Sequence, residues 1–195
     1  MSRHAKIERN TKETQISIEL EIDGSGHSVM NTKIPFFDHM LTLFARHGLL
    51  DLNIIANGDI EVDLHHTVED VGIALGQAFA KALGDKSGIR RYGWAYVPMD
   101  ETLTRAVIDF SGRPYLVYRA PTGVPSIGAF DFQLVEEFLR AFSVHSGTNL
   151  HVEILYGRDA HHMAESVFKG LSKAVDLACQ IDPRVQGIPS TKGVL

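Results

Sequence analysis

The sequence predicts an α+β fold made of two similar halves that pack together. The motif His-His-x-x-Glu starts at His65 and starts again at His161, 96 residues later. Apolar residues with helical spacing recur ahead of each motif, at 37–47 and at 135–145, and a short alternating strand separates helix from motif both times. Because such helices and strands each have one apolar side to bury, two strand-helix-strand-helix units should pack against each other.

The first half is predicted from periodicity alone. Apolar residues alternate along its opening strand, which ends at the turn Asp23-Gly24. A glycine-containing turn at 57–58 leads into the helix that begins with the first motif. The predicted elements are, in order, strand 14–22, helix 37–47, strand 50–55 and helix 65–79.

The second half repeats this order after a short basic seam at 85–93, which contains Lys86, Arg90 and Arg91. That seam is too short for a flexible interdomain linker. One domain of residues 1–195 is therefore expected, with halves of about 1–88 and 89–195, sheets on one side and helices on the other. The predicted elements of this half are strands 103–110 and 114–118, helix 135–145, strand 149–154 and helix 161–175.

Composition excludes several classes of protein. A net charge of −5 gives no electrostatic support for a nucleic-acid partner. No run of 18 apolar residues is present, so we expect no transmembrane helix, and the polar N-terminus does not resemble a signal peptide. The single cysteine, Cys179, cannot form an intrachain disulfide, and a reducing, cytoplasmic location is expected.

The repeated motif is typical of a centre with two metal ions. Imidazole and carboxylate both bind divalent transition metals. On a helix, His at i and Glu at i+4 share a face, while the neighbouring His points about 100° away, so one motif can serve two ions. Helix capping is the alternative, because acidic residues are favoured near a helix N-terminus. Capping accounts for Glu69 and Glu165 but not for four histidines.

The duplication also supplies further ligands, since His39 aligns with Glu137 at an offset of 98 residues. Without any thiolate in the set, a zinc-finger type of site is disfavoured, and mixed imidazole and carboxylate ligation suits Mn²⁺ or another six-coordinate ion. Asp38, beside His39, either orients a ligand or caps the helix. The two predicted ligand sets are His39, His66, His161 and Glu165, and Glu137, His162, His65 and Glu69.

Basic residues that break the repeat are candidates for binding an anionic substrate. Lys169 continues the helix face of His161 and Glu165, whereas the duplicate position is Ile73. Arginine binds oxyanions in a bidentate manner, lysine adds a point charge, and serine or threonine adds a hydroxyl donor. A phosphate-binding set is predicted from the basic residues Arg90, Arg91, Arg113 and Lys169 and the C-terminal residues Ser190, Thr191 and Lys192, although each of these alone is most simply a solvated surface residue.

Eight segments carry a resemblance to a known family: 9–14, 36–41, 63–70, 98–101, 111–115, 149–151, 161–169 and 189–193. Together, and in this order, they resemble the imidazoleglycerol-phosphate dehydratase family over essentially the whole chain. One departure is Glu137, where many relatives have histidine. The phosphatase domain that is fused to some relatives is not expected here.

The resemblance implies a manganese-dependent hydro-lyase of histidine biosynthesis that converts imidazole glycerol phosphate to imidazole acetol phosphate and water. It implies two Mn²⁺ per active site, no organic cofactor, and a homo-oligomer of twenty-four subunits with active sites at subunit interfaces. It also implies a fold like the second domain of ribosomal protein S5. Glu165 is the first candidate for the general base, with Glu69 and Glu13 as further catalytic candidates. Substrate binding is assigned to Glu13, His39, His47, Arg91, Arg113, Lys169, Ser190, Thr191 and Lys192.

The implied chemistry explains the need for metals. The proton that is lost sits on a carbon bearing only a hydroxyl, so the imidazole must act as the electron sink, helped by Lewis acids at its nitrogens. Two alternatives stay open: a metal-buffering protein with a His-rich surface, and a dimetal phosphohydrolase, in which aspartate or asparagine bridges would replace the paired histidines. Turnover of imidazole glycerol phosphate separates all three.

Overall fold

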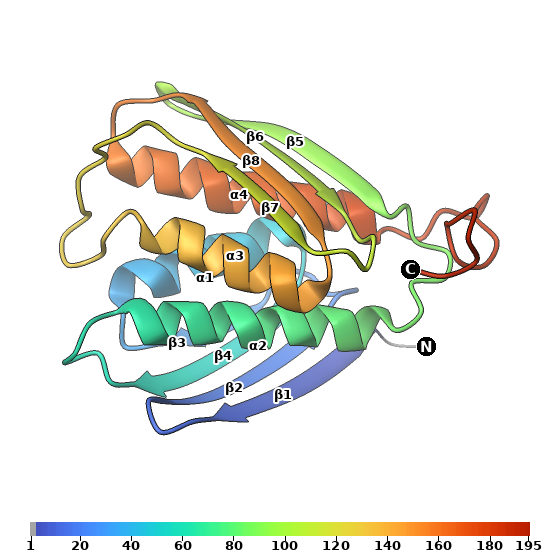
Figure 1. Cartoon of the computed structure of the whole chain (residues 1–195), viewed down its shortest axis with the longest axis horizontal. Helices are drawn as coiled ribbons and strands as arrows, with labels where there is room; N and C mark the ends of the chain where they lie inside the picture. Colours follow the sequence, from blue (N-terminus) through green and yellow to red (C-terminus); the bar gives the residue numbers. More distant parts are fainter. Residues whose placement is uncertain (1–2) are drawn as a thin grey trace.

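The computed structural model describes residues 3–195 and confirms an α+β fold of two similar halves (Figure 1). All the elements predicted from the sequence are present, and three more strands, β1, β3 and β5, accompany them. The first half contains β1 (His4–Asn10), β2 (Thr14–Glu21), β3 (Ser28–Asn31), α1 (Pro35–Gly48), β4 (Asp51–Gly58) and α2 (His65–Leu83). The second contains β5 (Tyr92–Met99), β6 (Thr102–Asp109), β7 (Tyr115–Arg119), α3 (Leu134–Ser146), β8 (Asn149–Tyr156) and α4 (Ala160–Cys179).

Each half forms a four-stranded sheet with the same topology. The strand orders are β1-β2-β4-β3 and β5-β6-β8-β7. In both sheets the first three strands are antiparallel, and the last one, β3 or β7, pairs in parallel with β4 or β8. A helix, α1 or α3, makes each parallel crossover. The predicted turn at 57–58 is the end of β4, and the loop begins after it.

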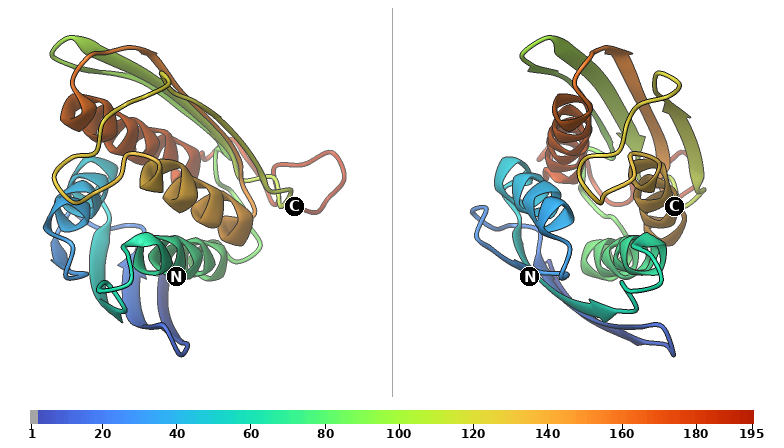
Figure 2. Two further views of the ribbon diagram at one scale, coloured as in Figure 1. Left: turned by 60° about the vertical axis from the view of Figure 1, so that its left-hand side comes forward. Right: turned by 90° about the vertical axis from the view of Figure 1, so that its left-hand side faces the viewer.

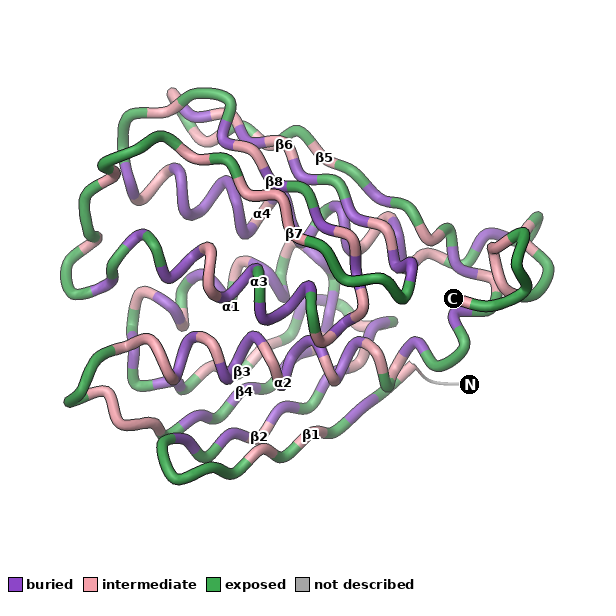
Figure 3. Tube along the Cα trace, in the orientation of Figure 1, coloured by how far each residue is buried: buried purple, intermediate pink, exposed green. Residues whose placement is uncertain are grey.

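The helices lie between the two sheets, as two views of the ribbon show (Figures 1 and 2). Sheets on one side and helices on the other were predicted, which holds within each half but is wrong for the whole domain. Each helix layer is apolar toward its own sheet and toward the other half, so stacking the layers buries both sides: α2 packs on α3 and α1 on α4. Buried residues accordingly concentrate in the middle layers (Figure 3).

Glycines allow two of these close contacts. A Cβ atom on Gly76 of α2 would lie 2.8 Å from the backbone oxygen of Phe142 in α3, and one on Gly93 of β5 would lie 1.8 Å from the backbone oxygen of Ala174 in α4. Larger residues at these positions would push the helix or strand away from its neighbour. The spacing of the layers, and hence of side chains on facing helices, depends on them.

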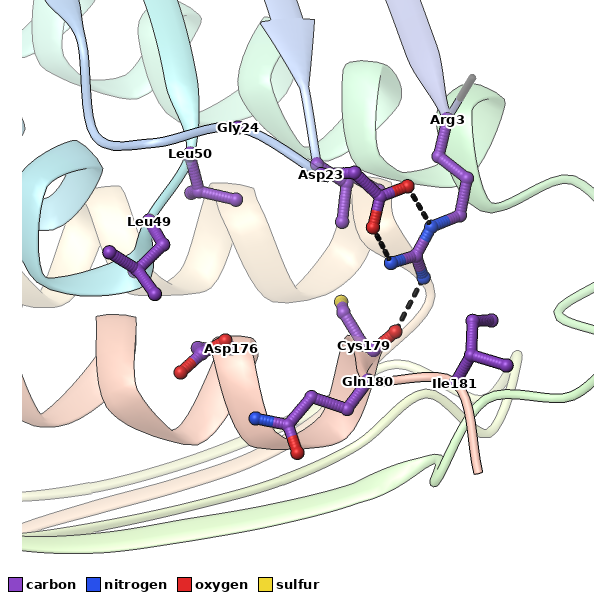
Figure 4. A pocket seen from close by; sticks show the side chains of 11 residues that line it. Arg3, Asp23, Gly24, Leu49, Leu50, Asp176, Cys179, Gln180 and Ile181 are labelled. Atoms are coloured by element: carbon purple, nitrogen blue, oxygen red, sulfur yellow. Dashed lines mark hydrogen bonds and ion pairs between the residues drawn. The ribbon is translucent and has the colours of Figure 1, made fainter. Parts of the chain in front are cut away.

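The C-terminal segment folds back on the seam between the halves. Gly88 donates its backbone N–H to Gly187 at 2.8 Å, and Arg90 donates to Gln180 at 2.9 Å. At the same end, Arg3 closes a pocket of about 440 Å³ by bonding the Asp23 carboxylate and the backbone oxygen of Cys179 (Figure 4). The thiol of Cys179 is buried, which raises its pKa to about 12. Among the described residues, no helix is long and apolar enough to cross a membrane.

Candidate active site

Helices α1 and α4 bring three of the predicted ligands together. Oε1 of Glu165 lies 2.9 Å from Nε2 of His39 and 3.0 Å from Nε2 of His161. The candidate ligand atoms of these three residues all lie within 4.8 Å of one another. His161 and Glu165 share a face of α4 one turn apart, and α1 supplies His39 because it packs against that face. Three of the four candidate ligands of the first predicted set therefore converge from both halves.

The second oxygen of Glu165 is held by Lys169. Lys169 Nζ donates to Glu165 Oε2 at 2.5 Å, one turn further along α4. Burial raises the pKa of the Glu165 carboxyl, but hydrogen bonds from Lys169, His39 and His161 outweigh this and hold the pKa at about 2. With only 6 % of its surface exposed, Glu165 is thus a buried carboxylate that is ionised at neutral pH.

The equivalent residues on helices α2 and α3 are more loosely arranged. His65 Nε2 lies 3.8 Å from Glu69 Oε2 on the first turns of α2. Glu137 of α3 and His65 line one pocket of about 560 Å³, together with Asp63. Arg140 Nε approaches Glu137 Oε2 at 3.8 Å. Of the residues that the structure describes, only the His39 group is compact enough for a single ion.

The second histidine of each motif lies outside these groups. His66 places Nδ1 3.1 Å from Asp59 Oδ2, and His162 places Nδ1 2.8 Å from Glu101 Oε2. The hydrogen bond that His66 donates to Asp59 raises the pKa of His66, and the one that His162 donates to Glu101 raises the pKa of His162. Within the described part of one chain, neither predicted four-residue set is complete, because these two histidines point to carboxylates elsewhere.

The predicted phosphate ligands, except Lys169, line one pocket. Arg91 is fixed by Asp109, with Nε 2.7 Å from Oδ1 and Nη2 3.1 Å from Oδ2, and it also donates to the backbone oxygen of Pro189 at 2.9 Å. This last bond holds the C-terminal loop against the residues that directly precede β5. The resulting pocket has a volume of about 450 Å³, and its lining includes Arg91, Arg113, Ser190, Thr191 and Lys192.

The other predicted substrate ligands lie apart from that pocket. Lys169 is beside Glu165, and His47, in the last turn of α1, faces α4. Burial lowers the pKa of His47, and the charges of Lys169 and Lys173 add to this effect. Glu13 is exposed in the turn between β1 and β2, where its charge acts on His66.

The compact His39 group and the phosphate pocket occupy opposite ends of α4. Arg91 donates its backbone N–H to Ala178 at the C-terminal end of this helix, at 2.9 Å. Glu165 lies 13 residues earlier, which at the helical rise corresponds to about 20 Å. One chain thus holds a metal-type group and an anion-type pocket that do not face each other.

Comparison with known proteins identifies the family. The family model for imidazoleglycerol-phosphate dehydratase matches residues 32–175. The chain belongs to the imidazoleglycerol-phosphate dehydratase family. It is 58% identical over 195 residues to the imidazoleglycerol-phosphate dehydratase of Geobacter metallireducens, and 56% identical over 193 residues to that of Thermoanaerobacter pseudethanolicus. These matches cover 100% and 99% of the chain, and 100% of each relative.

Solved structures of the family share the fold. The Staphylococcus aureus enzyme is 40% identical with a TM-score of 0.83, covering 92% of this chain and 99% of the other. The Pyrococcus furiosus enzyme in complex with (S)-C348 is 34% identical with a TM-score of 0.82, covering 97% and 100%. The α+β prediction and the family resemblance are both confirmed.

Sequence reasoning gave no role to two carboxylates that contact motif histidines. The signal that could have revealed a role for Glu101 is its place in segment 98–101, one of the segments that resemble the family. Asp59 gave no signal, since its contact with His66 depends on the path of the loop between β4 and α2. Asp38 accepts from the backbone N–H and hydroxyl of Thr32 at 2.8 and 2.7 Å, so it anchors the segment before α1.

Glu137 provides a first testable prediction for this family member. Replacing Glu137 by alanine should remove one of two bound metal ions, because a carboxylate ligand is lost at the looser group. Glu137→His should retain both ions and the activity, since imidazole serves the same metals. Metal content by elemental analysis checks this, with Glu136→Ala on the same turn as control. Two ions of unchanged affinity in Glu137→Ala would exclude it as a ligand.

Proposed function

We propose that this chain is a manganese-dependent hydro-lyase that converts imidazole glycerol phosphate to imidazole acetol phosphate and water in histidine biosynthesis. Family membership and the names of its relatives support this reaction. The observation that carries the proposal is the group formed by His39, His161 and Glu165, where two imidazoles meet a buried carboxylate. A separate basic pocket supplies the chemistry for a phosphate.

The residues present fit divalent manganese. The donors are imidazole nitrogens and carboxylate oxygens without thiolate, and the ionised Glu165 offsets the charge of an ion. We infer that His39, His161 and Glu165 hold one ion and that His65, Glu69 and Glu137 hold a second. His66 and His162 then complete the two sets from neighbouring subunits. When bound, the two ions supply Lewis-acid stabilisation of negative charge on the substrate's imidazole ring.

The protein's own groups divide the remaining work. The low pKa of Glu165 makes it a good anionic ligand. The candidates for the proton acceptor are Glu165 first, and then Glu69 and Glu13. Glu13 is exposed, so its carboxylate is also available to the glycerol hydroxyls. Arg91 and Arg113, with the C-terminal loop, bind the phosphate.

The separation along α4 favours active sites between subunits. Three carbons join the imidazole ring of the substrate to its phosphate oxygen, and this link is much shorter than the roughly 20 Å between Glu165 and the phosphate pocket. A single chain therefore cannot bind both ends of the substrate with these two groups. We propose that one subunit supplies the metal ligands and another the phosphate pocket, in a homo-oligomer of twenty-four chains.

A turnover assay tests the function. Purified protein loaded with MnCl₂ should form the ketone product from imidazole glycerol phosphate without releasing phosphate. Metal binding without turnover would instead support a metal-buffering protein. Release of inorganic phosphate would support the dimetal phosphohydrolase.

Lys169 is predicted to act mainly on substrate affinity. Lys169→Ala should raise KM by about 10- to 150-fold, the value of one charge-assisted hydrogen bond to phosphate, and leave the metal content intact. Lys173→Ala, one turn further along α4, is the matched control. A fall in metal content would show that Lys169 acts through Glu165 instead, and wild-type KM and kcat would remove it from the site.

A further inference from the structure

His66 and His162 have equivalent places and equivalent partners. Each is the second histidine of its motif, in the first turn of α2 or α4, and each points Nδ1 at a carboxylate. The distances are 3.1 and 3.2 Å from His66 to the two oxygens of Asp59, and 2.8 Å from His162 to Glu101 Oε2. An ionised carboxylate only accepts hydrogen bonds, so Nδ1 must carry the proton. In a neutral ring this leaves Nε2 with the free lone pair. Asp100 Oδ2 lies 3.7 Å from Nε2 of His162, which is beyond hydrogen-bond distance.

Glu101 is itself held rigidly. Its other oxygen, Oε1, accepts from the backbone N–H groups of Arg158 and Asp159 at 3.1 and 2.9 Å, and from the hydroxyl of Thr102 at 3.1 Å. Oε2 is therefore directed at His162 while Oε1 is anchored to the loop that begins α4. The histidine and its carboxylate are fixed to the same stretch of backbone, which limits how far the ring can turn.

The two carboxylates come from different parts of the repeat. Glu101 directly precedes β6, and the residue that directly precedes β2, at the equivalent place in the first sheet, is Glu13. His66 nevertheless bonds Asp59, which follows β4, and Asp59 donates its backbone N–H to the backbone oxygen of Glu13 at 3.1 Å. Within residues 3–195, no side chain bonds the Glu13 carboxylate. Asp59 thus replaces Glu13 as the partner of the histidine.

We propose that Glu101 and Asp59 are positioning residues that fix His162 and His66 with Nε2 available to a metal ion, and that the use of Asp59 in the first half releases Glu13 for the substrate. This rests on the proposed function, because it assigns these histidines to the metal centre. Carboxylates bonded to the remote nitrogen of a ligating imidazole typically improve metal affinity by about 10- to 100-fold.

Metal titration tests the first part without any turnover. Mn²⁺ binding to metal-free protein, followed by the EPR signal of free Mn²⁺, should be about 10- to 100-fold weaker for one ion in Glu101→Gln. The glutamine amide group has a single acceptor oxygen, so it cannot serve the backbone N–H groups and the ring together. Glu153→Gln, a carboxylate paired with Arg105 on the same sheet, is the control and should bind like wild type.

A double-mutant cycle separates positioning from a merely structural role. If Glu101 acts through His162, adding Glu101→Gln to His162→Ala should change affinity by less than about twofold. A full additional loss would mean that Glu101 only supports the loop before α4, and would overturn the proposal. Wild-type affinity in Glu101→Gln alone would overturn it as well.

The asymmetry is tested by a matched pair in the first half. Asp59→Asn should weaken Mn²⁺ binding, whereas Glu13→Gln should leave Mn²⁺ affinity unchanged and raise the KM for imidazole glycerol phosphate. The opposite pattern would make Glu13 the partner of His66. The titrations need no substrate, so the two proposals can fail separately. If the wild type is inactive but the variants bind Mn²⁺ as expected, only the proposed reaction is rejected. If the wild type is active but the Glu101 and Asp59 variants bind Mn²⁺ as tightly as it does, only the positioning roles are rejected.

Discussion

Glu165→Gln should lower kcat by about 100- to 10,000-fold and cost the protein at least one metal ion, the largest effect expected for any single substitution. Oε1 of Glu165 contacts both histidines of the compact group, and Oε2 contacts Lys169. A glutamine keeps the shape but carries no charge, and its amide nitrogen would face either the two imidazoles or the Lys169 ammonium. The substitution thus removes an anionic ligand and leaves the half-buried Lys169 ammonium without its carboxylate partner.

Elemental analysis and steady-state kinetics check this result together. Asp176→Asn, on the same helix but facing the pocket near Arg3, is the control and should keep its metal and its activity. If Glu165→Gln binds both ions as wild type does but is inactive, Glu165 acts as a proton carrier and not as a ligand. Full activity with full metal content would remove Glu165 from the centre.

Two inactive variants should restore each other when their subunits are mixed. Glu165→Gln lacks the metal-type group but keeps the phosphate pocket, while the double variant Arg113→Ala, Lys192→Ala has the opposite defect. These groups lie at opposite ends of α4, so each active site should take them from different chains. Random reassembly in equal amounts should then place both intact groups at about a quarter of the sites, and return about a quarter of wild-type activity.

The mixing experiment needs dissociation with a chelator and reassembly with MnCl₂, followed by assay at low substrate concentration. Assemblies mixed without dissociation are the control and should keep only the summed activity of the two variants. If the activity after reassembly is no higher than that of the control, each subunit carries a complete site of its own.

The helices that carry the repeated motif could be predicted from the sequence because their geometry is local. His161 and Glu165 must share a face at a spacing of four residues, whatever surrounds the helix. The 98-residue offset also aligned His39 with Glu137. Because duplicated halves repeat their contacts, this alignment predicted that His39 lies near the second motif. The phosphate-binding set was inferred from the kinds of side chain in these loops, and only the structure shows that Arg91, Arg113 and the C-terminal loop line one pocket.

The edge strands were harder to predict for a physical reason. β3 has only four residues, and β1 has a single buried position, Ala5, so neither shows a clear apolar period. β1 pairs with β2 across a short turn, whereas β3 is stabilised by parallel pairing with β4, which follows it only after α1.

By itself, the sequence determined the α+β class, the duplicated order of elements, the family and the helix faces that carry His39, His161 and Glu165, because all of these depend on short-range spacing or on ordered motifs. The tertiary structure decided that the helices lie between the sheets, that Asp59 and Glu101 bond the second histidines, and that the phosphate pocket lies at the far end of α4 from Glu165. Those features depend on how distant segments pack against each other, and a local pattern carries no information about the distance between them.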